Sequence, residues 1–129
     1  FYDKLILMFQ KEVAERIISK PNCKKYGKIS VMAQSRCNIK KLLEAPAKIF
    51  IPIPKVDGVI LELIPTLKFK HLDLKKLQLL LEKAFSQRRK KIKSNLKEYL
   101  SELNKLNIDE NLRAENLSVM QYCKLTSQL

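Results

Sequence analysis

The spacing of apolar residues changes near Pro65, and this change limits the folds open to the chain. Before it, runs rich in apolar and β-branched residues predict a strand at Leu5–Gln10, buried on both faces, and a second strand at residues 56–64. After it, apolar residues recur every three or four positions, which is the period of a helix. The sequence therefore predicts an α/β part in residues 1–66, followed by a small all-α domain in residues 67–129.

Shorter signals place the remaining elements. In the first part these are a helix at residues 11–19 with Val13, Ile17 and Ile18 directed inward, a helix at about 29–37, and a segment compatible with a strand at 39–43. In the second part, Asp73 is a suitable N-cap for a helix that begins at Leu74. Ser118 and Gln121 have the spacing of a capping box, which predicts a last helix from Val119 to about Gln128.

Residues 83–97 contain seven basic residues and no acidic one. The apolar stripe runs on through this stretch, so the pattern predicts a helix there. Arg88 falls on the stripe, where a charge is costly, and so either the helix breaks near residues 86–88 or Arg88 is held there for a partner. The cations on the opposite side are Lys83, Arg89, Lys90, Lys93 and Lys97. With a net charge of +13, nucleic acid is the first candidate partner, and a solvated basic surface is the alternative.

Composition excludes several classes of protein and of site. No apolar run is long enough to span a bilayer, and the start lacks the pattern of a secretory leader. The three cysteines form no CxxC pair, which favours buried reduced thiols in a cytoplasmic protein over a zinc site. His71, the only histidine, is expected in a surface linker. We therefore predict no metal site and no catalytic residue in these 129 residues.

Residues 50–57, FIPIPKVD, form the most specific local motif. Pro52 and Pro54 fix the backbone and remove two donors, so the segment cannot be a central strand. An aromatic residue just before such a stiff support is presented at a defined position, which suits stacking on a flat ligand such as a base. A core phenylalanine beside a proline turn is the alternative interpretation of Phe50, and the residues alone favour it.

Several separate motifs together resemble one family. They are QKEV at 10–13, YGKISVMAQ at 26–34, FIPIPKVD at 50–57, AFSQRRK at 84–90 and RAENLS at 113–118. In order and spacing these segments resemble the ribosomal RNA adenine dimethyltransferases of the KsgA type. The resemblance covers nearly all of the chain, and several motifs in the right order are more specific than any single one.

The resemblance implies a function for the intact protein. Members transfer methyl groups from S-adenosylmethionine to the exocyclic amines of two adjacent adenines near the end of small-subunit ribosomal RNA, during ribosome biogenesis. Phe50 would stack on the flipped-out adenine, and Pro52 and Pro54 would support its loop. The basic residues expected to bind RNA phosphates and to orient the helical domain are Arg88, Arg89, Lys90, Lys93 and Lys97.

The chain departs from the family pattern in ways that bear on activity. It lacks the glycine-rich cofactor loop and the Asn-Leu-Pro-Tyr motif that the family carries upstream, and Ile53 and Gly58 replace a frequent proline and a frequent serine. We therefore expect a fragment, comprising the closing strands and helices of a Rossmann-like methyltransferase domain and the whole helical domain. Such a fragment is expected to be inactive alone and able to pair with a copy of itself, whereas the intact protein is expected to be monomeric.

Three alternatives remain open at this stage. A related methyltransferase that modifies large-subunit RNA and confers antibiotic resistance is the nearest, but the motifs at 87–90 and 113–118 and their spacing speak against it. A second is a non-enzymatic nucleic-acid binder that keeps the fold. The third, a free-standing basic helical module that binds anionic surfaces, leaves residues 50–56 unexplained.

Overall fold

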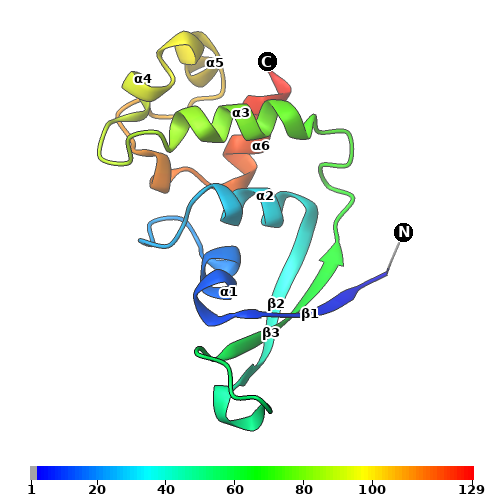
Figure 1. The fold of residues 1–129 in the computed structure, drawn as a ribbon. Helices are drawn as coiled ribbons and strands as arrows, with labels where there is room; N and C mark the ends of the chain where they lie inside the picture. The colour runs from blue at the N-terminus through cyan, green and yellow to red at the C-terminus, as the bar shows by residue number, and fades with distance from the viewer. Residues whose placement is uncertain (1–2) are drawn as a thin grey trace.

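A computed structural model describes residues 3–129 and shows a small antiparallel sheet beneath a group of helices (Figure 1). Three strands, β1 (Leu5–Gln10), β2 (Cys37–Ala45) and β3 (Gly58–Pro65), lie in the order β1-β3-β2. Both neighbours pair antiparallel with β3, with Gln10 and Ala45 opposite Gly58. The expected first and last strands are confirmed, and β2 extends beyond the segment expected at 39–43.

Within residues 3–129, six α-helices and three short 3₁₀ turns accompany the sheet. The helices are α1 (Lys11–Ile18), α2 (Lys28–Arg36), α3 (Leu74–Ala84), α4 (Ile92–Asn95), α5 (Leu100–Lys105) and α6 (Val119–Ser127). The 3₁₀ turns are Ala47–Ile49, Lys97–Tyr99 and Ala114–Asn116. The fold class is thus the expected one, with mixed α/β structure followed by helices.

The expected helix caps are confirmed. Asp73 accepts hydrogen bonds from the backbone N–H groups of Lys75 and Lys76 at 3.0 and 3.2 Å, which satisfies two donors that the first turn of α3 leaves free. Ser118 and Gln121 form the reciprocal capping box at the start of α6, with bonds of 2.9 and 3.1 Å. These local signals therefore fix where both helices begin.

Two apolar clusters hold the molecule together. In the first, Ala14 and Ile17 of α1 pack against Val59 and Leu61 on one face of the sheet. The second and larger cluster lies among the helices of the second part, but it also takes in Tyr26 and Val31 from the first part. Because this core draws on both parts, they pack on one another, and the domain boundary after residue 66 stays a prediction.

The expectation that β1 is buried on both faces is wrong for the described residues. Ile6 and Met8 are each 54% exposed, and Leu7 is also exposed. The reason is that β1 is an edge strand with α1 packed on one face of its sheet only. The expectation of buried cysteines also fails in part, since Cys37 and Cys123 are buried but Cys23 is exposed.

The basic stretch at residues 83–97 is not one helix. Helix α3 ends at Ala84, and the chain turns through residues 85–91, called here the basic loop, before α4 begins. The side-chain amide of Asn95 donates hydrogen bonds to the carbonyls of Ala84 and Gln87 at 3.0 and 2.9 Å. The bond to Ala84 satisfies a carbonyl that the end of α3 leaves free, and the bond to Gln87 fixes the loop that follows, so the break is stabilised by a residue of the next helix.

Candidate nucleic-acid interface

Phe50 lies in the loop between β2 and β3, at the end of the sheet farthest from the helical part (Figure 1). Its side chain is half-buried and borders a hollow of about 430 Å³. The other residues that line this hollow are Met8, Phe9, Gln10, Ile51, Pro52, Pro54, Val56, Asp57 and Gly58. A hollow of this size is in the range of small-ligand sites, and its lining is mostly apolar, as a stacked base requires.

Asp57 fixes the Phe50 loop at both ends. Its carboxylate accepts a hydrogen bond from the backbone N–H of Ala47 at 2.8 Å, and its backbone carbonyl accepts one from Lys11 at 2.9 Å. The first bond fixes the turn before Phe50, and the second ties the loop to the start of α1. The loop that carries Phe50 is therefore held by the aspartate of the motif as well as by the prolines.

Gly58 allows β3 to approach β1 closely beneath the hollow. A Cβ atom at this position would lie 3.0 Å from Sδ and 3.2 Å from Cγ of Met8. The serine frequent at this position would thus require the flexible Met8 side chain to move. Glycine in its place leaves Met8 in the wall of the hollow next to Phe50.

The wall that β1 supplies was not found from the sequence. Met8, Phe9 and Gln10 line the hollow because β1 pairs with β3 in a register that places Gln10 opposite Gly58. The strand pattern predicts that residues 5–10 are extended but gives neither the partner strand nor the register. Only a pairing between segments almost fifty positions apart brings these side chains beside Phe50.

The basic residues expected to bind RNA do not lie beside Phe50. They lie in and after the basic loop, in the helical part, while the Phe50 loop is at the far end of the sheet (Figure 1). Arg89, Lys90, Lys93 and Lys97 are exposed, and none forms an ion pair within the described residues. The expected site residues thus fall into two separate groups, one aromatic and one cationic.

Two other cations of the stretch are occupied by protein partners. Lys83 Nζ lies 2.6 Å from a carboxylate oxygen of Glu98 and 3.2 Å from the hydroxyl of Tyr99, and these contacts raise its pKa. Arg88 contacts the Lys24 carbonyl, the Glu115 carboxylate and the Phe85 ring. The sequence left open a helix break or an Arg88 held for a partner; the structure shows the break, and contacts within the protein hold Arg88.

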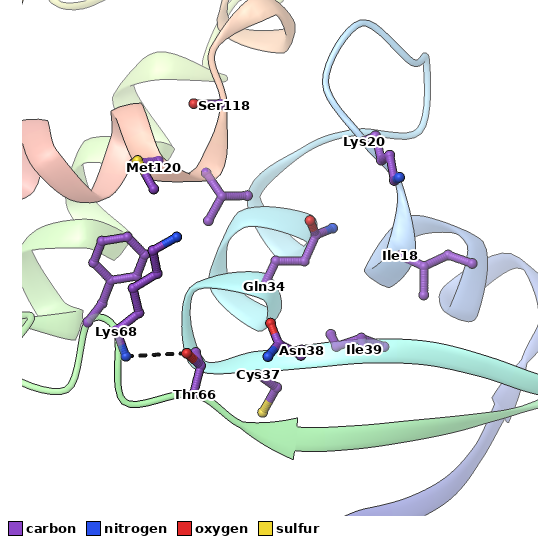
Figure 2. Close-up of a pocket in the computed structure, with 12 residues that line it drawn as sticks. Ile18, Lys20, Gln34, Cys37, Asn38, Ile39, Thr66, Lys68, Ser118 and Met120 are labelled. Carbon is purple, nitrogen blue, oxygen red and sulfur yellow. Dashed lines mark hydrogen bonds between the residues drawn. The ribbon is translucent and has the colours of Figure 1, made fainter.

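A second hollow, of about 450 Å³, lies where the α/β part meets the start of α6 (Figure 2). Gln34 points into it, but its amide donates to the carbonyls of Ile17 and Ser19 at 2.9 and 2.7 Å and so joins α2 to the end of α1. The backbone N–H of Lys68 donates to Thr66 at 3.3 Å. These polar groups are occupied by contacts between α1 and α2 and within the turn after β3, and we assign this hollow no ligand.

Residues 3–129 contain neither a candidate metal cluster nor a helix suited to crossing a membrane. Within that range, no three or more His, Cys, Asp or Glu side chains gather where they could hold a metal ion. Among the same residues, no helix has the length and apolar character needed to cross a bilayer.

Comparison with solved structures defines the fold. A crystal structure of a dimethyladenosine transferase from Plasmodium falciparum matches 97% of this chain and 56% of that chain, with a TM-score of 0.89 and 24% identity. A structure of the 23S rRNA methyltransferase ErmE matches 98% of this chain and 55% of that chain, with a TM-score of 0.62 and 18% identity. The chain therefore has the fold of part of these RNA methyltransferases.

Sequence comparison then defines the family. The family model described as ribosomal RNA adenine dimethylase matches residues 1–129. Proteins called ribosomal RNA small subunit methyltransferase A, from Yersinia pestis (strain Pestoides F) and Yersinia pseudotuberculosis serotype O:1b (strain IP 31758), are each 44% identical over 126 residues. The chain belongs to the ribosomal RNA adenine dimethylase family, as its motifs predicted. The match covers 95% of this chain and 46% of each relative, so the chain spans about half the length of the curated relatives it matches.

Proposed function

We propose that the intact protein containing this chain dimethylates two adjacent adenines, at the exocyclic amine, in the RNA of the immature small ribosomal subunit. This chain supplies the aromatic ring that receives an extruded adenine and the cations that hold the RNA. The enzyme acts in the cytoplasm as a monomer. The names of the family and of the 44%-identical relatives support the RNA substrate.

The single observation that carries the proposal is the half-buried ring of Phe50 at the edge of an apolar hollow. An adenine amine inside a duplex is out of reach, so the base must leave its stack at a cost of a few kcal/mol. Stacking on an aromatic side chain returns roughly 1–3 kcal/mol per base. The ring is neither sealed in the core nor free in solvent, and this intermediate burial leaves part of the side chain accessible to a base.

Positioning, rather than a strong base, is the main task of this site. The amine has to be held in line with the methyl donor, and a well-oriented pair of reactants gains several kcal/mol over free encounter. The hollow beside Phe50 is lined by a single carboxylate, that of Asp57, which already accepts the bond from Ala47. The described residues around Phe50 therefore support base binding and leave proton transfer to groups outside this chain.

The residues of this chain do not fit the role of a cofactor loop. The sequence has two glycines, Gly27 at the start of α2 and Gly58 beneath Met8, and no glycine-rich segment. We therefore assign S-adenosylmethionine, the methyl donor, to the remainder of the intact protein.

The exposed cations of the helical part hold the RNA at a distance from the methylated base. Arg89, Lys90, Lys93 and Lys97 have free charge at the surface, and each phosphate they neutralise releases counterions. Because they lie away from Phe50, they contact a different stretch of the same RNA. Such contacts fix register and carry no sequence information of their own.

The test is methyl transfer by the intact protein to small-subunit RNA, with Phe50→Ala compared with the parent. We expect a loss in kcat/KM of about 5- to 150-fold, which corresponds to the stacking energy of one base. Phe50→Tyr keeps a ring and should retain most activity. Ile53→Ala is the matched control, because Ile53 lies in the same loop, is 69% exposed and is not among the residues that line the hollow.

Two outcomes would contradict the proposal. Equal activity of Phe50→Ala and Ile53→Ala would show that Phe50 does not stack on the base. Intact protein that binds the RNA but leaves its adenines unmethylated, as judged by mass spectrometry of RNA digests, would instead indicate a non-enzymatic RNA-binding relative.

A further inference from the structure

Arg88 differs from its neighbours in the basic loop because its side chain is directed at the protein. One guanidinium nitrogen, Nη2, donates a hydrogen bond to the backbone carbonyl of Lys24 at 3.1 Å and lies 3.7 Å from a carboxylate oxygen of Glu115. The guanidinium carbon also lies 5.3 Å from the centre of the Phe85 ring. A single side chain thus joins the basic loop to the first part of the chain and to the turn before α6.

The partners of Arg88 are themselves fixed in place. The ring of Phe85 lies between the buried tyrosines, with centroids 6.3 Å from Tyr26 and 5.9 Å from Tyr122. The backbone carbonyl of Glu115 accepts a hydrogen bond from the N–H of Asn22 at 2.8 Å. The guanidinium therefore docks on a surface that two other sets of contacts already hold rigid.

The chemistry of this docking site requires arginine. The site combines a carbonyl, a carboxylate and an aromatic face, and a planar guanidinium can donate to the first two while it stacks on the third. A lysine ammonium is a point charge with strong hydration, and it cannot meet the three groups together. The site thus requires the planar shape of the guanidinium as well as its charge.

We propose that Arg88 is a positioning residue: it fixes the basic loop against the α/β part and so sets where Arg89 and Lys90 meet the RNA. The inference rests on the proposed function, since it concerns the same RNA contacts. Arg89 and Lys90 follow Arg88 directly, are exposed and have no ion-pair partner within the described residues. Anchoring the first residue of this triplet restricts the directions in which the other two project.

Charge-conserving and charge-removing substitutions, compared in the intact protein, separate positioning from direct contact. Arg88→Lys and Arg88→Gln should lower the RNA affinity equally, by roughly tenfold, because both release the loop that carries two phosphate contacts. At the neighbouring position, Arg89→Lys should keep the parent affinity. Arg89→Gln should weaken binding and reduce the salt slope, log Kd against log salt, by about 0.7–0.9, the value for one lost phosphate contact.

Two further measurements tie the effect of Arg88 to the loop. In a background that carries Arg89→Gln and Lys90→Gln, Arg88→Lys should have little further effect, since a residue that acts through these cations is not additive with them. Glu115→Gln tests the direction in which the RNA affinity changes. It removes a negative charge, which on charge alone would strengthen RNA binding, but it also frees Arg88, so positioning predicts a loss. Because Glu115→Gln leaves Arg88 intact, it serves if the Arg88 variants fail to fold.

The outcomes separate this inference from the proposed function. If Arg88→Lys retains the parent affinity while Arg88→Gln loses it, or if Glu115→Gln strengthens RNA binding, Arg88 contacts RNA itself and the positioning role is overturned. If Arg89→Gln and Lys90→Gln together leave RNA binding unchanged, the phosphate contacts of the proposed function fail, and with them the positioning of those contacts.

Discussion

Two tyrosines and a cysteine, whose side chains lose a proton only in alkali, are buried close together in the core of the helical part: Tyr26, Tyr122 and Cys123. The hydroxyls of Tyr26 and Tyr122 donate to the backbone carbonyls of Leu117 and Ala114 at 2.7 and 2.6 Å, and so hold the turn before α6 from two sides. Burial raises the pKa of both phenols well above the usual value of 10. It also raises the pKa of the Cys123 thiol from 9.0 to about 11. Each group is thus held in its neutral form by the fold.

We expect the protein to lose stability in alkali because of these groups. Each has a higher pKa folded than unfolded, so its contribution is complete below the unfolded value, 9.0 for Cys123 and 10.0 for the tyrosines, and is lost as the pH rises above it. The free energy of unfolding, measured by chemical denaturation, should be flat to about pH 9 and then fall by about 1.4 kcal/mol per pH unit for each titrating group. Tyr26→Phe should be less stable at pH 8 but decline less steeply above pH 10. An equal slope in Tyr26→Phe and the parent would contradict this account.

At the scale of elements, the stretch from α3 to α5 shows what a periodic pattern reveals and what it misses. The apolar stripe correctly predicts that Leu77, Leu81, Ile92, Leu96 and Leu103 are buried. It also predicts one continuous helix, which is wrong. Two consecutive helices that pack on one core show the same spacing of apolar residues, every three or four positions, as a single long helix does. The pattern therefore predicts which residues face inward but not where a helix ends. The end depends on Asn95, whose bonds to Ala84 and Gln87 form only in the folded chain.

The same limit applies to the candidate site. Asp73 and Ser118 could be predicted as caps because their chemistry is local, whereas the residues around Phe50 favoured a core ring, and its stacking role was predicted from the family resemblance. The β1 wall of the hollow and the partners of Arg88 depend on contacts between distant segments. A charge on an apolar stripe did mark Arg88 as unusual, and this was the available signal that it has a special partner.

Asn95→Ala should destabilise the junction between α3 and α4. The substitution removes the side-chain donor of the Ala84 carbonyl, at a cost of about 1–3 kcal/mol, while the Gln87 carbonyl keeps its bond from the N–H of Lys90 at 3.0 Å. Ser94→Ala is the matched control, because Ser94 is the adjacent residue, is exposed and forms no side-chain hydrogen bond among the described residues. Urea unfolding of both variants measures the difference. A loss in Asn95→Ala no larger than that in Ser94→Ala would show that the break is fixed by the loop itself.

At the scale of the whole molecule, one face of the sheet remains open. Residues paired across an antiparallel sheet point to the same side, so the register places Met8, Ile60 and Leu43 in one row on the face opposite α1. Met8 is 54% exposed and Leu43 is 51% exposed. An exposed apolar row on a sheet whose edge strand β1 also offers unpaired backbone groups is a surface suited to association.

We therefore expect the 129-residue chain, prepared alone, to self-associate through this face, and the intact protein to remain monomeric. Sedimentation velocity over a range of concentrations should show dimers or larger species for the chain alone. Met8→Lys and Leu43→Lys place charges on the open face and should shift the chain toward monomer. Leu79→Lys, at a 58% exposed position in α3, adds the same charge to the helical part and should leave the association unchanged. A chain that sediments as a monomer at every concentration would contradict the prediction, and an equal shift for Leu79→Lys would attribute any association to charge rather than to this face.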